Sequence, residues 1–231
     1  MARSLACLAV LALVCTACGS STNKISRPAW VRAGAYAPAI RPADFVPTVT
    51  NRFFPLTPGT TFRYAGHQGR AQRAEVVAVM RGTKRILGIS ATVVRDTVLR
   101  RSHPIRRTFA WYAQDRHGNV WALGRRVLDR RHRRWIRARA SWTAGVHGAK
   151  PGVVMRGHPH RGDHYREELS RSGGALVQAR VTALDPLTTV EWSPFGPRLT
   201  RKVYVAGVGE ISAQVTQGGH EAFRLVSVTR G

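Results

Sequence analysis

Residues 108–124 constrain the fold more than any other stretch, because they predict two aromatic strands joined by a tight turn. The turn sequence Asp-Arg-His-Gly-Asn occupies residues 115–119. A short loop that contains glycine between two β-rich runs is typical of a β-hairpin. A three-residue loop at 116–118 would give Gly118 a positive φ. It would also set three pairs, namely Asp115 with Asn119, Ala113 with Trp121, and Trp111 with Leu123.

This register predicts which side chains share a face of the hairpin. Successive side chains of a strand point to opposite faces. Phe109, Trp111, Trp121 and Leu123 therefore gather on one face, and Trp142 belongs to the next alternating run. We interpret these five residues as a candidate wall for an apolar or amphiphilic ligand. The alternative is that they form part of a closed core.

The remaining chain reads as short strands with closely spaced turns, and no stretch has the period of an amphipathic helix. Expected strands cover residues 60–64, 73–80, 85–89, 91–99, 163–169, 175–184, 188–192, 199–206, 209–216 and 221–228. We expect turns at 82–83, 172–174 and 218–219, a bulge at Gly88, and an apolar plug of Phe53, Phe54 and Leu56. The prediction is an all-β domain with a single antiparallel curved sheet, either a barrel or a half-barrel.

The N-terminus predicts export and a lipid anchor. Arg3 precedes an uncharged apolar run at residues 5–14, which has the pattern of a secretory signal and is short for a membrane span. Residues 15–18 resemble a bacterial lipobox, although Cys15 stands where leucine is usual. We predict a lipoprotein signal peptide at residues 1–17, a lipidated Cys18, and a place on the extracytoplasmic face of the cell membrane. The alternative is an ordinary cleaved signal with an incidental cysteine.

A flexible tether is predicted at residues 18–48, before a β-rich extracytoplasmic domain at 49–231. Proline fixes φ and removes a hydrogen-bond donor, so no regular element is expected between Pro28, Pro38, Pro42 and Pro47. The three cysteines are Cys7, Cys15 and Cys18. The domain can therefore hold neither an internal disulfide nor a cysteine metal site.

The net charge of +25 comes almost entirely from arginine, since only four lysines are present. Such a charge favours anionic surfaces, and an overall Arg bias on a solvated surface is the alternative. The densest part is a predicted second hairpin with its tip at residues 129–134. Its arginines, Arg130, Arg131, Arg133 and Arg134, could each contribute about 1 kcal/mol at an anionic membrane surface. The export signal argues against nucleic acid as a partner.

Several motifs indicate a resemblance to an uncharacterised family of bacterial secreted lipoproteins. They are Asn51-x-Phe53-Phe54-Pro55-Leu56-x-Pro58-Gly59-Thr60, Val94-Arg95-Asp96-Thr97, Trp111-Tyr112-Ala113-Gln114-Asp115-x-x-Gly118-Asn119-Val120-Trp121, Gly162-Asp163-x-Tyr165-Arg166-x-Glu168 and Glu191-Trp192-x-Pro194. The resemblance implies an extracytoplasmic β-rich domain, similar to the open half-barrels of lipoprotein carriers, and implies no known activity. This chain departs from the family in the basic segment 125–139 and in being shorter before Glu191.

No catalytic residue, metal or cofactor is predicted. His158, His160, Asp163 and His164 are closely spaced, but Pro159 and nearby arginines work against a zinc site. The acids expected inside the domain each lie near an arginine and are interpreted as members of ion pairs; they are Asp96, Asp163, Glu168 and Glu191. No nucleophile elbow, P-loop or dinucleotide fingerprint is present.

These observations favour a non-enzymatic, membrane-anchored envelope lipoprotein that binds an apolar or amphiphilic ligand in a curved β-sheet. One alternative is a structural or interaction module that contacts anionic lipid or cell-wall polymer through Arg-rich loops. A second alternative is a hydrolase, which would need a cleft with two free carboxylates or a Ser-His pair.

Overall fold

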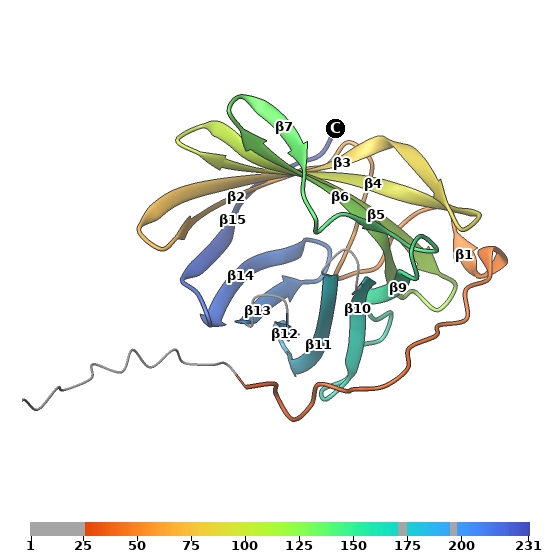
Figure 1. Cartoon of the computed structure of the whole chain (residues 1–231). Helices are drawn as coiled ribbons and strands as arrows, with labels where there is room; N and C mark the ends of the chain where they lie inside the picture. The colour runs from red at the N-terminus through yellow and green to blue at the C-terminus, as the bar shows by residue number, and fades with distance from the viewer. Residues whose placement is uncertain (1–25, 171–174, 195–197) are drawn as a thin grey trace, which may run out of the picture.

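Twelve antiparallel strands form a closed barrel in the computed structural model, which describes residues 26–170, 175–194 and 198–231 (Figure 1). Each strand pairs with the next one in the ring, and pairing of the last strand with the first closes it. The strands are β2 (Thr61–Gln68), β3 (Ala71–Ile86), β4 (Ile89–Arg100), β5 (His103–Asp115), β6 (Val120–Arg131), β9 (Lys150–Met155), β10 (His164–Ser170), β11 (Ala175–Leu184), β12 (Leu187–Ser193), β13 (Arg198–Val205), β14 (Gly209–Gln217) and β15 (Glu221–Thr229). The all-β prediction is confirmed, and closure selects the barrel over the half-barrel.

Short elements are added to this ring. Strands β7 (Arg134–Arg137) and β8 (Trp142–Thr143) pair with β6, and β1 (Phe45–Val46) pairs with β5. A 3-10 turn, η1 (Pro42–Asp44), is the only helical element in the described ranges. Within those ranges, no helix has the length and apolarity that crossing a membrane requires.

Between β3 and β4, the structure has a register shift where a turn was predicted and a turn where a bulge was predicted. β3 continues through Gly82, where the register shifts between Val79 and Thr83. The chain turns instead at Leu87 and Gly88, whose φ angles are 50° and 79°. Two successive positive φ angles are what a two-residue hairpin turn needs, so Gly88 serves the turn. The prediction of a turn at 82–83 is therefore wrong.

The central hairpin has the predicted register only near its turn. Asp115 and Asn119 are hydrogen-bonded, Gly118 has a φ of 77°, and Ala113 faces Trp121. A bulge then makes Trp111 face Gly124 instead of Leu123. A side chain at Gly124 would lie 2.5 Å from the carbonyl oxygen of Trp142, so the close approach of β8 requires glycine there.

Part of the predicted tether packs on the barrel. Val31 is buried, and the carbonyl of Arg32 accepts a hydrogen bond of 2.9 Å from Gln178 Nε2 on β11. η1 and β1 also lie in this segment, so the prediction of no regular element fails at residues 42–46. The predicted signal peptide and Cys18 lie outside the described residues.

One end of the barrel is filled by the predicted apolar plug. Phe53 and Leu56 pack with inward side chains of the strands, and Phe54 packs beside them. Asn51 fixes the segment, because its Nδ2 donates to the carbonyl oxygens of Gly118 at 2.8 Å and Arg156 at 3.0 Å. The opposite end carries the β2–β3, β4–β5, β6–β7 and β14–β15 turns. We call this second end the mouth.

Candidate functional site

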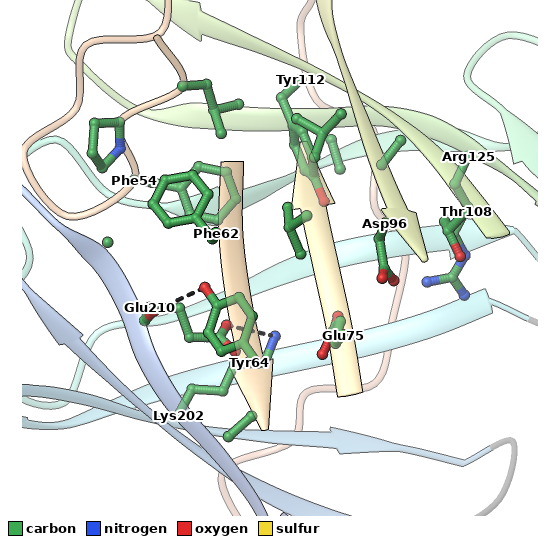
Figure 2. Close-up of a pocket in the computed structure, with 18 of the residues that line it drawn as sticks. Phe54, Phe62, Tyr64, Glu75, Asp96, Thr108, Tyr112, Arg125, Lys202 and Glu210 are labelled. Carbon is green, nitrogen blue, oxygen red and sulfur yellow. Dashed lines mark hydrogen bonds and ion pairs between the residues drawn. The ribbon is translucent and has the colours of Figure 1, made fainter. Parts of the chain in front are cut away.

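A pocket of about 380 Å³ lies inside the barrel beneath the plug (Figure 2). Its plug-side wall is apolar and comes from the plug and from β2 to β5. The residues of this wall are Phe54, Pro55, Leu56, Phe62, Val77, Val94, Ala110 and Tyr112. The rings of Phe54 and Tyr112 meet edge to face, with centroids 5.2 Å apart. An apolar compartment therefore occupies the closed end of the barrel.

The rest of the pocket wall combines polar and charged side chains with small or apolar residues. The polar and charged ones are Tyr64, Glu75, Asp96, Thr108, Arg125, Glu168, Lys202 and Glu210, and the others are Ala122, Gly124, Val208, Gly209 and Ala213. Strand alternation explains the arrangement, because side chains two positions apart point to the same face. Glu75 therefore points into the barrel with Val77, and Asp96 points inward with Val94. The hydroxyl of Tyr64 donates to the carbonyl oxygen of Glu210 at 2.9 Å. The pocket is thus apolar at one side and ionisable at the other.

Glu75 and Asp96 form a carboxyl pair, which we call the dyad. Val77 faces Asp96 across β3 and β4, so Glu75 lies diagonally opposite Asp96, and each carboxyl acts on the pKa of the other. Two carboxyls that share a site do not ionise together, so they hold one proton between them. Burial, and then the neighbouring Asp96, raises the pKa of Glu75 to about 8. Burial raises the pKa of Asp96 to about 6, and its Oδ1 is buried without a hydrogen-bond partner.

Lys202 of β13 is the cation at the centre of the interior. Its Nζ lies 2.7 Å from Glu191 Oε1 and 3.6 Å from Glu210 Oε2. Burial opposes the charged form of Lys202, but Glu191 and Glu210 outweigh it and hold its pKa well above the ordinary value. Burial raises the pKa of Glu210 to about 7, although Lys202 acts in the opposite direction. This cluster is an ion pair with a second carboxylate in reach.

A bulge in β10 directs two consecutive acids inward. The register of β10 against β11 shifts between Arg166 and Glu168, which breaks the alternation at Glu167. Glu168 Oε1 pairs with Arg125 at 2.8 Å. Burial, followed by the charge of the neighbouring Glu191, raises the pKa of Glu167 well above its ordinary value.

The interior therefore has the opposite charge balance to the whole chain. The chain has 37 basic and 12 acidic residues. Among the described side chains inside the barrel, six acids share their surroundings with two cations, Arg125 and Lys202; the acids are Glu75, Asp96, Glu167, Glu168, Glu191 and Glu210. Even when the pairs Glu75–Asp96 and Glu167–Glu191 each hold one proton, the acids carry more negative charge than the two cations balance.

The predicted aromatic face lies on the outside of the barrel wall. Trp111, Leu123 and Trp142 are 6%, 0% and 4% exposed and pack together in one cluster. Lys84 Nζ lies 3.7 Å above the Trp111 ring. We call this group the outer cluster. Trp121 donates to Asp115 Oδ2 at 2.8 Å, and Phe109 lies against Arg126.

None of the five residues of the predicted ligand wall lines the interior pocket. Trp111, Leu123 and Trp142 are instead parts of a packed core, which was the alternative interpretation. The predicted face therefore lies on the same hairpin as part of the pocket wall, but on the other side of it.

The predicted basic tip is confirmed as an exposed hairpin between β6 and β7. Arg131 faces Arg134, and the two turn residues His132 and Arg133 have φ angles of 47° and 65°. All four predicted arginines are exposed. Ile136 beside them is 48% exposed, and Trp135 stacks against Arg107 at 4.6 Å. The hairpin stands at the mouth of the barrel (Figure 1).

The predicted acid pairings are partly correct. Glu168 does pair with an arginine, Arg125, but Glu191 pairs with Lys202 and Asp96 with Glu75. Asp163 Oδ2 lies 3.8 Å from His160 Nδ1 in an exposed loop. In the described part of the chain, no group of three or more His, Cys, Asp or Glu residues could hold a metal ion.

Sequence reasoning missed Glu75, Lys202, Glu210 and the role of Tyr64. A signal for them did exist. Glu75, Glu191 and Glu210 interrupt strands of small and β-branched residues in a chain with few acids. When a chain has few acids, an acid inside such a strand indicates an inward position with a partner.

Comparison with known proteins finds one distant likeness. A solved structure from Bacteroides fragilis, named as an exported protein with a YmcC-like fold, has a TM-score of 0.42 and 10% identity. The match covers 78% of this chain and 100% of that chain. No family model matches this sequence, and no curated protein does. A likeness this low carries no functional argument, and the resemblance to secreted lipoproteins stays a prediction.

Proposed function

We propose that this protein is a non-enzymatic binding protein that holds a small amphiphile inside its barrel. The observation that carries the proposal is the interior pocket, with Phe54, Phe62 and Val94 at its apolar side and the dyad at its polar side. Its volume of about 380 Å³ falls within the usual range for small-molecule sites. The apolar part of the ligand would lie against the plug, and its polar head would face the ionisable side chains.

The pairing of the interior acids supports binding over hydrolysis. Glycoside hydrolysis uses two separated carboxyls, one of them free to act as nucleophile or base. In the described interior, Glu168 is paired with Arg125, Glu191 with Lys202, and Glu75 with Asp96. The same groups are well arranged to recognise a polar head.

A filling substitution tests the site directly. Ala110→Phe places a ring in the pocket, while Ala74→Phe places the same ring on the exposed side of β3. Nile red, an uncharged dye that fluoresces in apolar surroundings, is titrated into each protein. We expect wild type and Ala74→Phe to bind the dye and Ala110→Phe to lose at least about tenfold in affinity. Equal binding by the two variants, both shown to be folded by circular dichroism, would contradict the proposal.

The proposal includes a place in the cell envelope. The lipobox-like segment supports attachment through Cys18, since two or more acyl chains give stable anchoring. Cys18→Ser should move the expressed protein from the detergent phase to the aqueous phase in a phase-partition experiment. If wild type already partitions into the aqueous phase, the anchor is absent.

A second candidate function is contact with an anionic surface through the basic tip. It is favoured by the exposure of all four arginines on a two-residue turn, with Ile136 exposed beside them. Cations beside an exposed apolar side chain suit a surface of anionic lipid. Anionic cell-wall polymer would use the arginines without Ile136.

Charge reversal with a matched control tests the second candidate. In one variant Arg130, Arg131, Arg133 and Arg134 become Glu, and in the other the exposed barrel-wall residues Arg63, Arg85, Arg95 and Arg180 become Glu. The two proteins have the same net charge. Binding to phosphatidylglycerol vesicles should be lost only in the first. Equal loss in both would show that overall charge, rather than the tip, attracts the surface.

A further inference from the structure

We propose that the polar head of the bound amphiphile is an ammonium group, and that the dyad of Glu75 and Asp96 receives it. This inference rests on the proposed function and names its ligand class. It joins three observations: the sign of the charge inside the pocket, an acceptor atom without a donor, and the apolar space beside it.

The described cations near the dyad are each paired with another acid. Arg106, which acts on Asp96 from β5, pairs through its Nε with Asp129 Oδ1 at 2.7 Å. Arg125 is engaged by Glu168, and Lys202 is engaged by Glu191 with Glu210 in reach. The dyad has no cation of its own among the described side chains that line the pocket. With one shared proton it retains one negative charge. A ligand that brings a positive charge would compensate that charge where the protein does not.

The geometry of Asp96 gives the ammonium a place. Its Oδ1 is buried and has no hydrogen-bond partner, while the side chain lines the pocket. A buried acceptor without a donor costs free energy that a ligand N–H can recover. Figure 2 shows the carboxyls of Asp96 and Glu75 directed into the same space, with Phe54 and Phe62 farther toward the plug. A chain attached to the nitrogen would run along this apolar side.

The basic exterior does not prevent this selectivity. Exposed arginines are screened by salt over about 8 to 10 Å. The dyad lies inside the wall, where the effective dielectric constant is lower and each charge acts more strongly. The local excess of acid therefore decides which head group is bound.

The dyad also makes the binding depend on pH. The groups that face it from the surrounding strands are Tyr64 on β2, Arg106 on β5, Lys202 on β13 and Glu210 on β14. Glu75 and Asp96 have raised pKa values of about 8 and about 6. The dyad is uncharged well below the lower value and gains negative charge as the pH rises. An alkylammonium stays protonated throughout this range, so its affinity should rise with pH.

Three ligands that share an octyl chain provide the test. Octylammonium, octanol and octanoate are titrated into the protein near neutral pH by calorimetry. We expect octylammonium to bind about tenfold more tightly than octanol, and octanoate to bind most weakly. This preference should disappear below about pH 5, where both members of the dyad hold protons.

Isosteric substitutions locate the effect. Asp96→Asn keeps the size of the side chain and removes the charge that the dyad carries near neutral pH. It should lower the affinity for octylammonium by about tenfold and leave octanol within about twofold. Glu75→Gln replaces the member that holds the proton near pH 7, because the pKa of Glu75 is about 8 and that of Asp96 about 6. This second variant keeps the charge on Asp96 and should leave both affinities within about twofold of wild type. Asp44→Asn changes the net charge as much as Asp96→Asn does, but Asp44 is exposed in η1, outside the barrel. It should change neither affinity.

The outcomes separate this inference from the proposed function. If octanol and octylammonium bind equally, or octanoate binds best, the ammonium inference is wrong and the amphiphile site stands. If none of the three binds, both proposals fall. If octylammonium is preferred but Asp44→Asn weakens it as much as Asp96→Asn does, net charge rather than the dyad is responsible, and the inference is again wrong.

Discussion

The two faces of the β5–β6 hairpin differ sharply, although they alternate residue by residue. On the outside, Trp111 and Leu123 pack with Trp142 in the outer cluster, which segment 138–149 covers. On the inside, Ala110 and Tyr112 line a pocket. The large apolar side chains therefore build the closed core, and the small and polar ones leave room. Aromatic content alone did not indicate the face that carries the pocket.

The comparison shows that open space occurs in this barrel where side chains are small or where charged groups need partners. The outer cluster excludes water because its residues fill each other's gaps. The inner face cannot close in the same way, because carboxyl and ammonium groups need partners and hydration. The following predictions probe this contrast, from the largest expected effect to the smallest.

Removing the centre of the outer cluster should have the largest effect. Trp142→Ala leaves a cavity next to Trp111 and Leu123 and should lower the free energy of unfolding by about 3 to 5 kcal/mol. Urea denaturation followed by circular dichroism measures this change. Nile red binding by the folded fraction should remain as in wild type. A variant that keeps full stability would show that the outer cluster is loosely packed.

Removing the interior cation Lys202 should lower the stability of the protein nearly as much. Lys202→Met leaves Glu191 and Glu210 without their partner, which should destabilise the protein by about 3 kcal/mol at neutral pH. The deficit should shrink as the pH falls below the Glu210 pKa of about 7, because protonation removes the unpaired charge. Urea midpoints measured at several pH values test this, and a deficit independent of pH would argue against a charged pair.

Glu75→Gln should stabilise the protein, whereas the two preceding substitutions destabilise it. The pKa of Glu75 is raised from 4.5 to about 8, so the unfolded chain loses its proton at a lower pH than the folded one. This group therefore makes stability fall as the pH rises from about 4.5 to about 8. Gln cannot ionise and can still donate to Asp96. The variant should match wild type near pH 4 and exceed it by about 1 to 3 kcal/mol near pH 8. Thermal denaturation at both pH values measures the difference, and a wild type that gains stability over this range would contradict it.

Changes at the basic tip should affect stability least. Alanine at Arg130, Arg131, Arg133 and Arg134 removes exposed side chains and should shift the free energy of unfolding by no more than about 0.5 kcal/mol. Urea denaturation again provides the value. A larger loss would mean that the tip belongs to the packed structure, and would weaken its assignment as a free surface.

Local rules predicted much of the fold and little of the pocket. Turn chemistry and alternation were enough for the strands and for the register at Ala113 and Trp121. They failed where a bulge shifts the register, as between Val79 and Thr83 and beside Glu167, because a bulge depends on the partner strand. The pocket also needs β15 to pair with β2, a contact between Thr61 and Thr229 that no local pattern contains.

The central claim is that ligand binds inside the barrel and not on the outer aromatic face. Leu56 lines the interior pocket, and Leu123 lies in the outer cluster. One sample with ¹³C-labelled leucine methyls therefore reports on both faces at once. With octanol added, nuclear Overhauser contacts from its chain should reach the Leu56 methyls and not those of Leu123. Contacts to Leu123 without contacts to Leu56 would contradict the account.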